Sequence, residues 1–336
     1  MLNDPVALAE LLMAVDSTSG QEGQAVEALE RLLGGAGWRI TRIPVTPGRD
    51  DLYARSISGT CPVTLSTHID TVPPFIAPRR DKMRVYGRGA CDAKGIAASM
   101  MVAAERLRLR GTPVGLLFVV GEEVSHDGAH AANAWARANP PGSRAIINGE
   151  PTESTLALGT KGAIRLVVRT KGQAAHSAYP HLGQSATRDL VNLLSDLDAI
   201  ELPTDDLLGD TTINIGSLGG GVADNVVAPA AEARLMIRLV TPAGKVQPIL
   251  EKWAKGRATL EWGVTVPPMR LGTIPGFPTS VAAFATDIPQ LTNWGTPYLF
   301  GPGSVHVAHR DDESIEIGEL SRSVDAYERL ATTLAG

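Results

Sequence analysis

Short apolar segments alternate with helical patterns over the first half of this 336-residue chain. Residues 63–67, 114–120 and 144–147 are apolar runs of the length expected for buried strands. Apolar residues at helical spacing predict helices over residues 93–110 and 128–138. This order of strands and helices favours an α/β domain with a doubly wound, mostly parallel sheet.

Polar side chains follow these three strands at the point where each strand ends. His68 follows the first strand, Glu122 and Glu123 the second, and Glu150 the third. In open α/β sheets, ligands bind at the carboxyl ends of the strands. We therefore expect these four side chains to gather at one edge of the sheet.

The segment from Leu65 to Asp92 carries the first half of a predicted two-metal hydrolytic site. His68 and Asp70 lie two residues apart, so on a straight strand they face the same side and cannot easily bind one ion. Asp70 is better suited to accept the other ring N–H of His68 and so to fix its tautomer. Asp92, in the turn GRGACD, offers two oxygens that can bridge two ions, or it merely caps the helix that follows.

Glu122 and Glu123 are consecutive, so their side chains diverge on an extended segment. This divergence suits one metal ligand and one general base better than two equivalent ligands. The alternative is a pair of solvated glutamates in a loop. Glu150, in the segment NGEPT, is a candidate ligand only together with the other acids that follow strands.

Six further histidines occur in the sequence, and five of them lie in segments that could give them a role. His306 and His309 lie in SVHVAHRDDESI, and one of them is a candidate for the last metal ligand. His126 and His130 can share a helix face, but no glutamate of a His-Glu-x-x-His zinc site lies between them, so we expect surface residues. His176 lies far in sequence from the ligands and needs another role or none.

The pattern changes after about Gly159. The next elements run strand, helix, strand, strand, helix, strand, which is the order of a ferredoxin-like module. They are expected at residues 164–170, 183–197, 212–215, 233–239, 242–253 and 258–264. A helix near residues 280–285, a strand near Tyr298 and a last helix over residues 317–334 follow. We therefore expect a catalytic domain of residues 1–160 and 267–336, interrupted by an inserted domain of residues 161–266.

Composition disfavours several classes of protein. The net charge of −5 argues against nucleic acid as a partner, because phosphate binding needs a dense basic face. No apolar run reaches the ~18–20 residues that span a membrane. Cys61 and Cys91 form no Cys-x-x-Cys pattern and the amino terminus lacks a basic signal segment, so a reducing cytoplasm is expected. Motifs for a serine nucleophile and for nucleotide binding are also missing.

Six segments, taken together and in this order, resemble a known family of co-catalytic zinc enzymes. It contains acetylornithine deacetylase, succinyl-diaminopimelate desuccinylase, aminoacylase and carboxypeptidase G. The segments are STHIDTVP, YGRGACDAKG, GEEVSHDGA, NGEPT, AHSAYPHLGQSA and HVAHRDDESI. The resemblance extends from His68 to Ile315 and implies two Zn²⁺ ions, for which Co²⁺ or Mn²⁺ can substitute.

The resemblance also implies roles for individual residues. The implied metal ligands are His68 and Glu150 for one ion, Glu123 and His309 for the other, and Asp92 as the bridge. Asp70 would orient the first histidine, and Glu122 would be the general base and acid. His176 would polarise the scissile carbonyl from across a dimer interface. Asn225 and Arg238 match positions that contact substrate, and a guanidinium suits a carboxylate.

The implied activity is removal of an acyl group from an amino acid. Acetylornithine deacetylase is the first expectation, together with the shorter relatives that release lysine or ornithine from an acidic carrier protein. The alternatives are a dipeptidase, an aminopeptidase or a succinyl-diaminopimelate desuccinylase, and, outside this class, a homologue that binds metal without turnover. The chain departs from many members at Ala93, because those members have another residue after the bridging aspartate. In the family, the peptide bond between the aspartate and this next residue is often cis.

Overall fold

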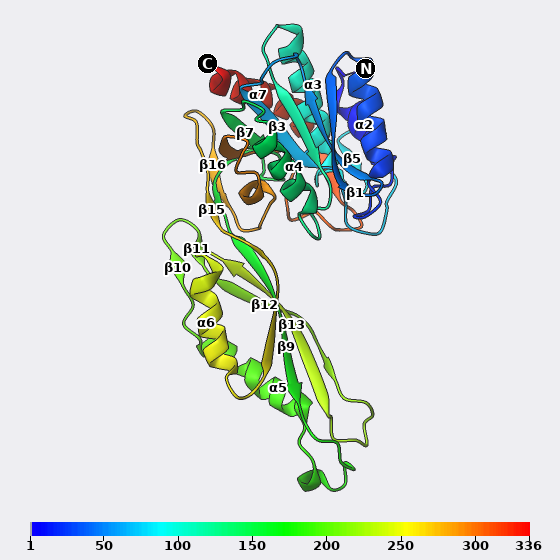
Figure 1. The fold of residues 1–336 in the computed structure, drawn as a ribbon. Coiled ribbons are helices and arrows are strands. Elements are labelled where there is room, and N and C mark those ends of the chain that lie inside the picture. The colour runs from blue at the N-terminus through cyan, green and yellow to red at the C-terminus, as the bar shows by residue number, and fades with distance from the viewer. Residues whose placement is uncertain (1) are drawn as a thin grey trace. The chain divides into compact units, whose positions relative to one another are not determined.

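The computed structural model describes residues 2–336, and the chain forms two compact units (Figure 1). The first unit contains the residues up to Leu158, together with Leu271–Ser280 and Thr286–Gly336. The second unit contains Gly159–Arg270 and Val281–Ala285. The first unit is therefore discontinuous in sequence, and the second interrupts it.

The first unit is built on a six-stranded sheet with the order β1-β2-β6-β3-β7-β17. The strands are β1 (Arg39–Thr46), β2 (Arg49–Arg55), β6 (Gly115–Val119), β3 (Val63–His68), β7 (Ala145–Asn148) and β17 (Thr296–Leu299). The four strands from β6 to β17 are parallel to one another. At the other edge of the sheet, β2 pairs with β6 in antiparallel fashion, and β1 pairs with β2 in the same way. The prediction of a mostly parallel sheet is confirmed.

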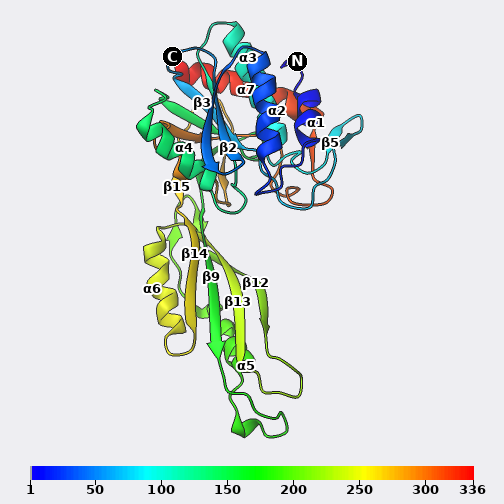
Figure 2. The same ribbon diagram turned by 45° about the vertical axis from the view of Figure 1, so that its right-hand side comes forward.

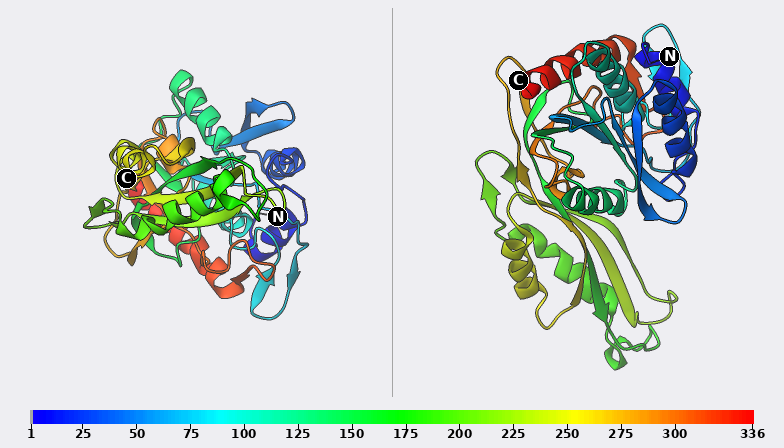
Figure 3. Two further views of the ribbon diagram at one scale, coloured as in Figure 1. Left: turned by 90° about the horizontal axis from the view of Figure 1, so that it is seen from below. Right: turned by 45° about the horizontal axis from the view of Figure 1, so that its top comes forward.

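Helices cover both faces of this sheet (Figure 3). Leu116 and Phe118 of β6 face one core cluster, and the alternate residues Leu117 and Val119 face another, as the two-residue period of a strand requires. The first cluster receives side chains from four helices and the second from one. The helices are α1 (Pro5–Met13), α2 (Gly23–Gly35), α3 (Lys94–Leu109) and α7 (Ile317–Ala335), and on the other face α4 (Asp127–Ala138).

Several short strands of the structure were not predicted. One small sheet has the order β18-β5-β4, and another has the order β15-β8-β16. Their strands are β4 (Arg79–Arg80), β5 (Arg84–Tyr86), β18 (Ser314–Glu316), β8 (Leu156–Thr160), β15 (Met269–Arg270) and β16 (Thr279–Ala282). The prediction of a helix near residues 280–285 is wrong, because the strand β16 lies there. The β-branched Thr279 and Val281 favour a strand at this position.

The second unit has a four-stranded antiparallel sheet with the order β12-β13-β9-β14 (Figure 2). Its main elements are β9 (Gly162–Lys171), α5 (Ala186–Ser195), β12 (Thr212–Gly220), β13 (Ala230–Leu239), α6 (Ala243–Ala254) and β14 (Thr259–Val266). The hairpin β10 (Thr204–Asp205) and β11 (Gly209–Asp210) precedes β12. Ile164 and Leu166 pack with Leu190 of α5 and Leu250 of α6 in a separate core. This arrangement confirms the predicted ferredoxin-like α+β module.

Two further observations concern the two cysteines and the helices of the chain. Cys61 and Cys91 are both free and buried, so neither is part of a disulfide. Among residues 2–336, no helix combines the length and the apolar character needed to cross a membrane.

Candidate metal centre

His68 is the last residue of β3, a strand that is buried along its whole length. Its ring nitrogen Nδ1 lies 3.0 Å from the backbone oxygen of Asp70 and 3.4 Å from the carboxylate oxygen Oδ1 of the same residue. Both are acceptors, so Nδ1 carries the ring proton. The other nitrogen, Nε2, lies 3.0 Å from Oδ1 of Asp92. Burial opposes the charged ring, but the hydrogen bonds with Asp70 and Asp92 raise the pKa of His68 well above its ordinary value, so a metal ion at Nε2 would replace a proton there. His68 therefore presents a ligand atom to the acidic group.

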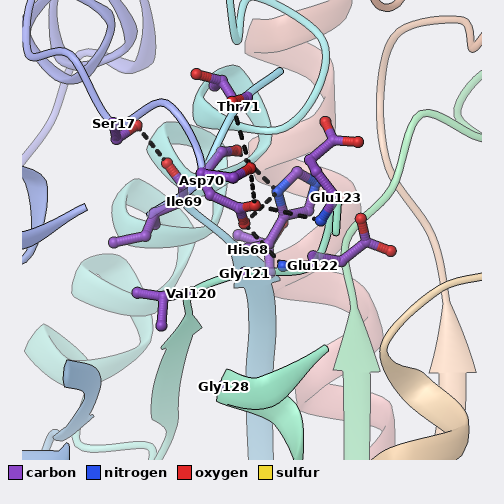
Figure 4. Close-up of polar contacts among 12 residues, drawn as sticks. Ser17, His68, Ile69, Asp70, Thr71, Val120, Gly121, Glu122, Glu123 and Gly128 are labelled. Atoms are coloured by element: carbon purple, nitrogen blue, oxygen red, sulfur yellow. Dashed lines mark hydrogen bonds and ion pairs between the residues drawn. The ribbon is translucent and has the colours of Figure 1, made fainter. Parts of the chain in front are cut away.

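Asp70 organises the loop after β6 as well as the imidazole. Its carboxylate accepts hydrogen bonds from the backbone N–H groups of Glu122 at 3.0 Å and Glu123 at 3.2 Å (Figure 4). It also accepts one from the Ser19 hydroxyl at 2.7 Å. Burial opposes ionisation, but these donors and His68 together lower the pKa of Asp70. The expected support of His68 is thus only part of what this residue does.

Asp92 lies in the turn before α3, and the peptide bond between Asp92 and Ala93 is cis. No side-chain hydrogen bond caps α3, so Asp92 is not its N-cap. The turn is held instead by Glu313, whose Oε1 accepts the N–H groups of Cys91 and Asp92, each at 3.2 Å. The other oxygen of Glu313 pairs with Arg88 at 2.8 Å, and both side chains are buried. Sequence reasoning assigned no role to this pair.

The two oxygens of Asp92 face two different histidines. Oδ1 lies 3.0 Å from Nε2 of His68, and Oδ2 lies 3.3 Å from Nε2 of His309. Glu123 approaches Nε2 of His309 to 3.1 Å, and Glu150 approaches Nε2 of His68 to 4.0 Å. The five residues expected to bind metal are therefore brought together, with Asp92 between two His–Glu pairs.

This group of side chains fits two divalent cations. Glu150 is 5% exposed, and its Oε1 has no hydrogen-bond partner among residues 2–336. Burial raises the pKa of Glu150 and of Glu123, because several carboxylates share one desolvated space. Divalent cations would neutralise these charges and satisfy the unpaired oxygen. Two imidazoles and three carboxylates, without a thiolate, form a donor set that zinc accepts.

Glu122 and Glu123 leave the same loop in different directions (Figure 4). The Glu122 side chain is mostly buried, and burial together with the neighbouring Glu150 raises its pKa well above the ordinary value. A raised pKa suits a group that must take up a proton and later release it. The geometry thus separates a candidate ligand, Glu123, from a candidate base, Glu122.

Gly121 fixes the start of this loop. Its φ is +73°, and a Cβ at this position would lie 2.1 Å from Oδ1 of Asp127 and 2.7 Å from Nη2 of Arg49. Arg49 binds Asp127 at 2.7 Å and the buried Glu22 at 2.8 Å. Only glycine therefore fits between β6 and the two glutamates.

The other histidines of the first unit are placed differently from one another. His130 is exposed on α4, as expected, and His306 is exposed outside the acidic group. His126 is buried, so the expectation of a surface residue is wrong for it. It precedes α4 in a left-handed conformation, with φ of 55°, and its Nδ1 lies 2.8 Å from Oδ1 of Asp287. The prediction from helical spacing was wrong for His126 because this residue lies before the first residue of α4.

The remaining predicted residues belong to the second unit. His176 is exposed, and its Nδ1 accepts the N–H of Ala178 at 3.1 Å, so Nε2 carries the ring proton. The backbone oxygen of Asn225 accepts the N–H of Ser177 at 2.9 Å, which places the two predicted residues in adjacent segments. Arg238 lies on β13 and is half-buried. Their roles in catalysis stay predictions.

Comparisons with known proteins agree on one family. The model of Peptidase family M20/M25/M40 matches residues 64–333. A probable carboxypeptidase from Paracoccidioides brasiliensis is 35% identical, covering 97% of this chain and 84% of that protein. An M20 family metallo-carboxypeptidase from Sulfolobus solfataricus has a similar fold, with a TM-score of 0.81 at 16% identity over 99% of both chains. A dinuclear metal binding M20 peptidase from Bacillus subtilis has a TM-score of 0.71 at 17% identity, covering 98% of this chain and 97% of its own. The chain therefore belongs to peptidase family M20/M25/M40 and is a hydrolase of peptide or amide bonds.

Proposed function

We propose that this hydrolase uses two zinc ions to cleave the amide bond between an acyl group and an amino acid, releasing a carboxylate and a free amine. The observation that carries the proposal is the position of Asp92, whose two oxygens each face the Nε2 atom of a different histidine, at 3.0 and 3.3 Å. Two ligand sets that share one carboxylate are the arrangement of a two-metal hydrolytic site.

When bound, the metal ions would polarise the scissile carbonyl and lower the pKa of the attacking water. Glu122 takes a proton from this water as its oxygen bonds to the carbonyl carbon. The same carboxyl then gives the proton to the amide nitrogen, and the carbon–nitrogen bond breaks. The raised pKa of Glu122, caused by burial and by Glu150, helps it to hold the proton between the two steps.

The acyl group and the amino acid are the finer part of the proposal. An acetylornithine deacetylase, a carrier-protein lysine or ornithine hydrolase and a carboxypeptidase all release an amino acid with a free carboxylate. The name of the relative from Paracoccidioides brasiliensis favours the carboxypeptidase among these. We infer that Arg238 binds this carboxylate and that His176 acts across a homodimer formed by the second unit. A chain lacking residues 165–262 should then sediment as a monomer, and a persistent dimer would reject that interface.

A hydrolysis screen tests the substrate class. The panel contains N-acetyl-ornithine, N-acetyl-citrulline, N-succinyl-diaminopimelate, free dipeptides, dipeptides blocked at the amino terminus, dipeptides amidated at the carboxyl end and a glutamyl-lysine mimic. We expect cleavage only where the amino-acid carboxylate is free. Cleavage of the blocked dipeptides would indicate a carboxypeptidase, whereas cleavage of a peptide with an amidated carboxyl end would support an aminopeptidase and reject the proposal.

A variant of Glu122 tests the mechanism. Glu122→Gln removes the proton acceptor, so we expect a loss of kcat of about 10²–10⁴-fold with two zinc ions retained per chain. Glu27→Gln is the matched control, because Glu27 is exposed and, within residues 2–336, forms an ion pair with Arg31 alone, at 3.7 Å. Full hydrolysis by Glu122→Gln would show that another group is the base. Fewer than one tightly held zinc ion in the unaltered protein would reject the two-metal centre.

A further inference from the structure

A second cluster of potential ligands lies in the first unit, beside the metal centre. Nδ1 of His126 is 2.8 Å from Oδ1 of Asp287 and 3.9 Å from Oε1 of Glu122. One ligand atom from each of the three residues lies within 4.8 Å of the other two. The two measured separations resemble those in the metal centre, which run from 3.0 to 4.0 Å. The cluster is therefore compact enough for one cation.

Two buried carboxylates in and beside this cluster each have an oxygen without a hydrogen-bond partner among the described residues. Asp287 is 1% exposed, and its Oδ2 has no hydrogen-bond partner among the described residues. Asp51 is also fully buried, with an unpaired Oδ2 of its own. Burial and then the nearby charge of Asp287 raise the pKa of Asp51, whereas Arg49 opposes the shift. A cation bound in the cluster would satisfy this buried oxygen of Asp287, because Arg49 is already held by two other carboxylates.

The backbone holds His126 in this place. Its N–H donates to the backbone oxygen of Gly121 at 2.8 Å, and α4 begins immediately after it. The two neighbours of Nδ1 are carboxylate oxygens, so a cation can replace the proton that the ring shares with Asp287. One imidazole and two carboxylates are a set of three ligands that zinc accepts, with the remaining position open to water.

We propose that Glu122, His126 and Asp287 form a third zinc site, weaker than the two of the metal centre, and that filling it inhibits hydrolysis. A zinc ion bound there would occupy the carboxylate of Glu122. That carboxylate could then no longer accept a proton from water. The binding site stands on the geometry alone, whereas the inhibition rests on the proposed role of Glu122 as the base.

The test uses the full chain, already loaded with two zinc ions, and the variant His126→Asn. Asparagine tolerates the left-handed conformation of this position better than other residues with a β-carbon. His130→Asn is the matched control, because His130 lies four residues later and is exposed. Equilibrium dialysis against a series of free zinc concentrations measures uptake, and the same series measures hydrolysis.

We expect the unaltered protein and His130→Asn to take up a third zinc ion over the concentrations at which hydrolysis falls. His126→Asn should need on the order of tenfold or more free zinc for both effects. Equal uptake by His126→Asn and the unaltered protein would overturn the site. Uptake that changes as expected, in a protein that hydrolyses none of the substrates, would support the site and reject the proposed function. If circular dichroism shows that His126→Asn is unfolded, Asp287→Asn replaces it with the same expected results.

Discussion

Replacing Glu313 by glutamine removes the negative charge that holds the turn of Asp92. Glu313 is fully buried, Arg88 is 2% exposed, and their side chains meet at 2.8 Å. The guanidinium also donates to the backbone oxygen of Arg310 at 3.1 Å, next to His309. The change therefore leaves a buried cation without its counter-ion between the segments that carry two candidate ligands.

Breaking a buried ion pair by removing one partner costs about 3–5 kcal/mol. Glutamine keeps one oxygen that can accept the N–H groups of Cys91 and Asp92, so we assign the loss in Glu313→Gln to the contact with Arg88, which loses both its counter-charge and its hydrogen-bond acceptor. Glu313→Ala also removes that acceptor, and each buried N–H left unpaired adds about 1–3 kcal/mol. Burial raises the pKa of Glu313, although Arg88 acts in the opposite direction. Burying the two charges therefore costs much of the free energy that their attraction contributes. The net contribution of the intact pair to stability is smaller than the loss that follows when one partner is removed.

Urea denaturation measures the free energy of unfolding of the first unit. Replacing Trp253 and Trp262 by phenylalanine removes the tryptophans of the second unit, so the remaining fluorescence reports the first. In this background, Glu313→Gln should lose about 3–5 kcal/mol. The double variant Arg88→Met with Glu313→Gln should lose less than the sum of the single variants, because it leaves no unpaired charge. A loss below about 1 kcal/mol, or strict additivity, would refute the reasoning.

Three further predictions concern the same centre. Gly121→Ala places a Cβ 2.1 Å from Asp127 at a positive φ, so urea denaturation should show a loss of at least about 1–2 kcal/mol; an unchanged midpoint would contradict the steric argument. Asp70→Asn should lower zinc affinity about 10- to 100-fold in a chelator competition, and unchanged affinity would remove Asp70 from the support of the site. In the metal-free protein, hydrogen bonds with two carboxylates raise the pKa of His309 from 6.5 to about 10. The stabilisation from this protonated ring is complete below pH 6.5 and is lost as the pH rises through about 10. Zinc binding at pH 8 must therefore release this proton, and calorimetry in buffers of different ionisation enthalpy should detect the release and find it reduced in His309→Asn.

The part of the site that the sequence predicts rests on a local pattern. His68, Glu122 and Glu150 each follow a short apolar strand, and parallel strands end at the same edge of a sheet. A strand pattern and the parallel sheet therefore suffice to bring these residues together. The different directions in which the side chains of Glu122 and Glu123 leave the loop follow from their being adjacent on the chain.

The residues that sequence reasoning missed act over long separations or in unusual backbone. Glu313 binds the N–H of Asp92 across 221 positions, and no periodicity relates the two. His126 was assigned to a helix face by its spacing to His130, but it adopts a left-handed conformation before the helix. The prediction of a helix near residues 280–285 was wrong although a local signal was present, because it gave no weight to the β-branched Thr279 and Val281 of β16.

The interruption of the first unit sets an order for biosynthesis. A ribosome completes residues 159–270 before it makes His309 and Glu313, so the second unit can fold while the centre still lacks a ligand and the support of Asp92. During this interval Asp92 and Glu123 lack the contacts that His309 makes with them in the folded first unit. In the two-metal centre that we propose, the ligand set is therefore complete only after the chain has returned to the first unit with Leu271–Ser280 and Thr286–Gly336.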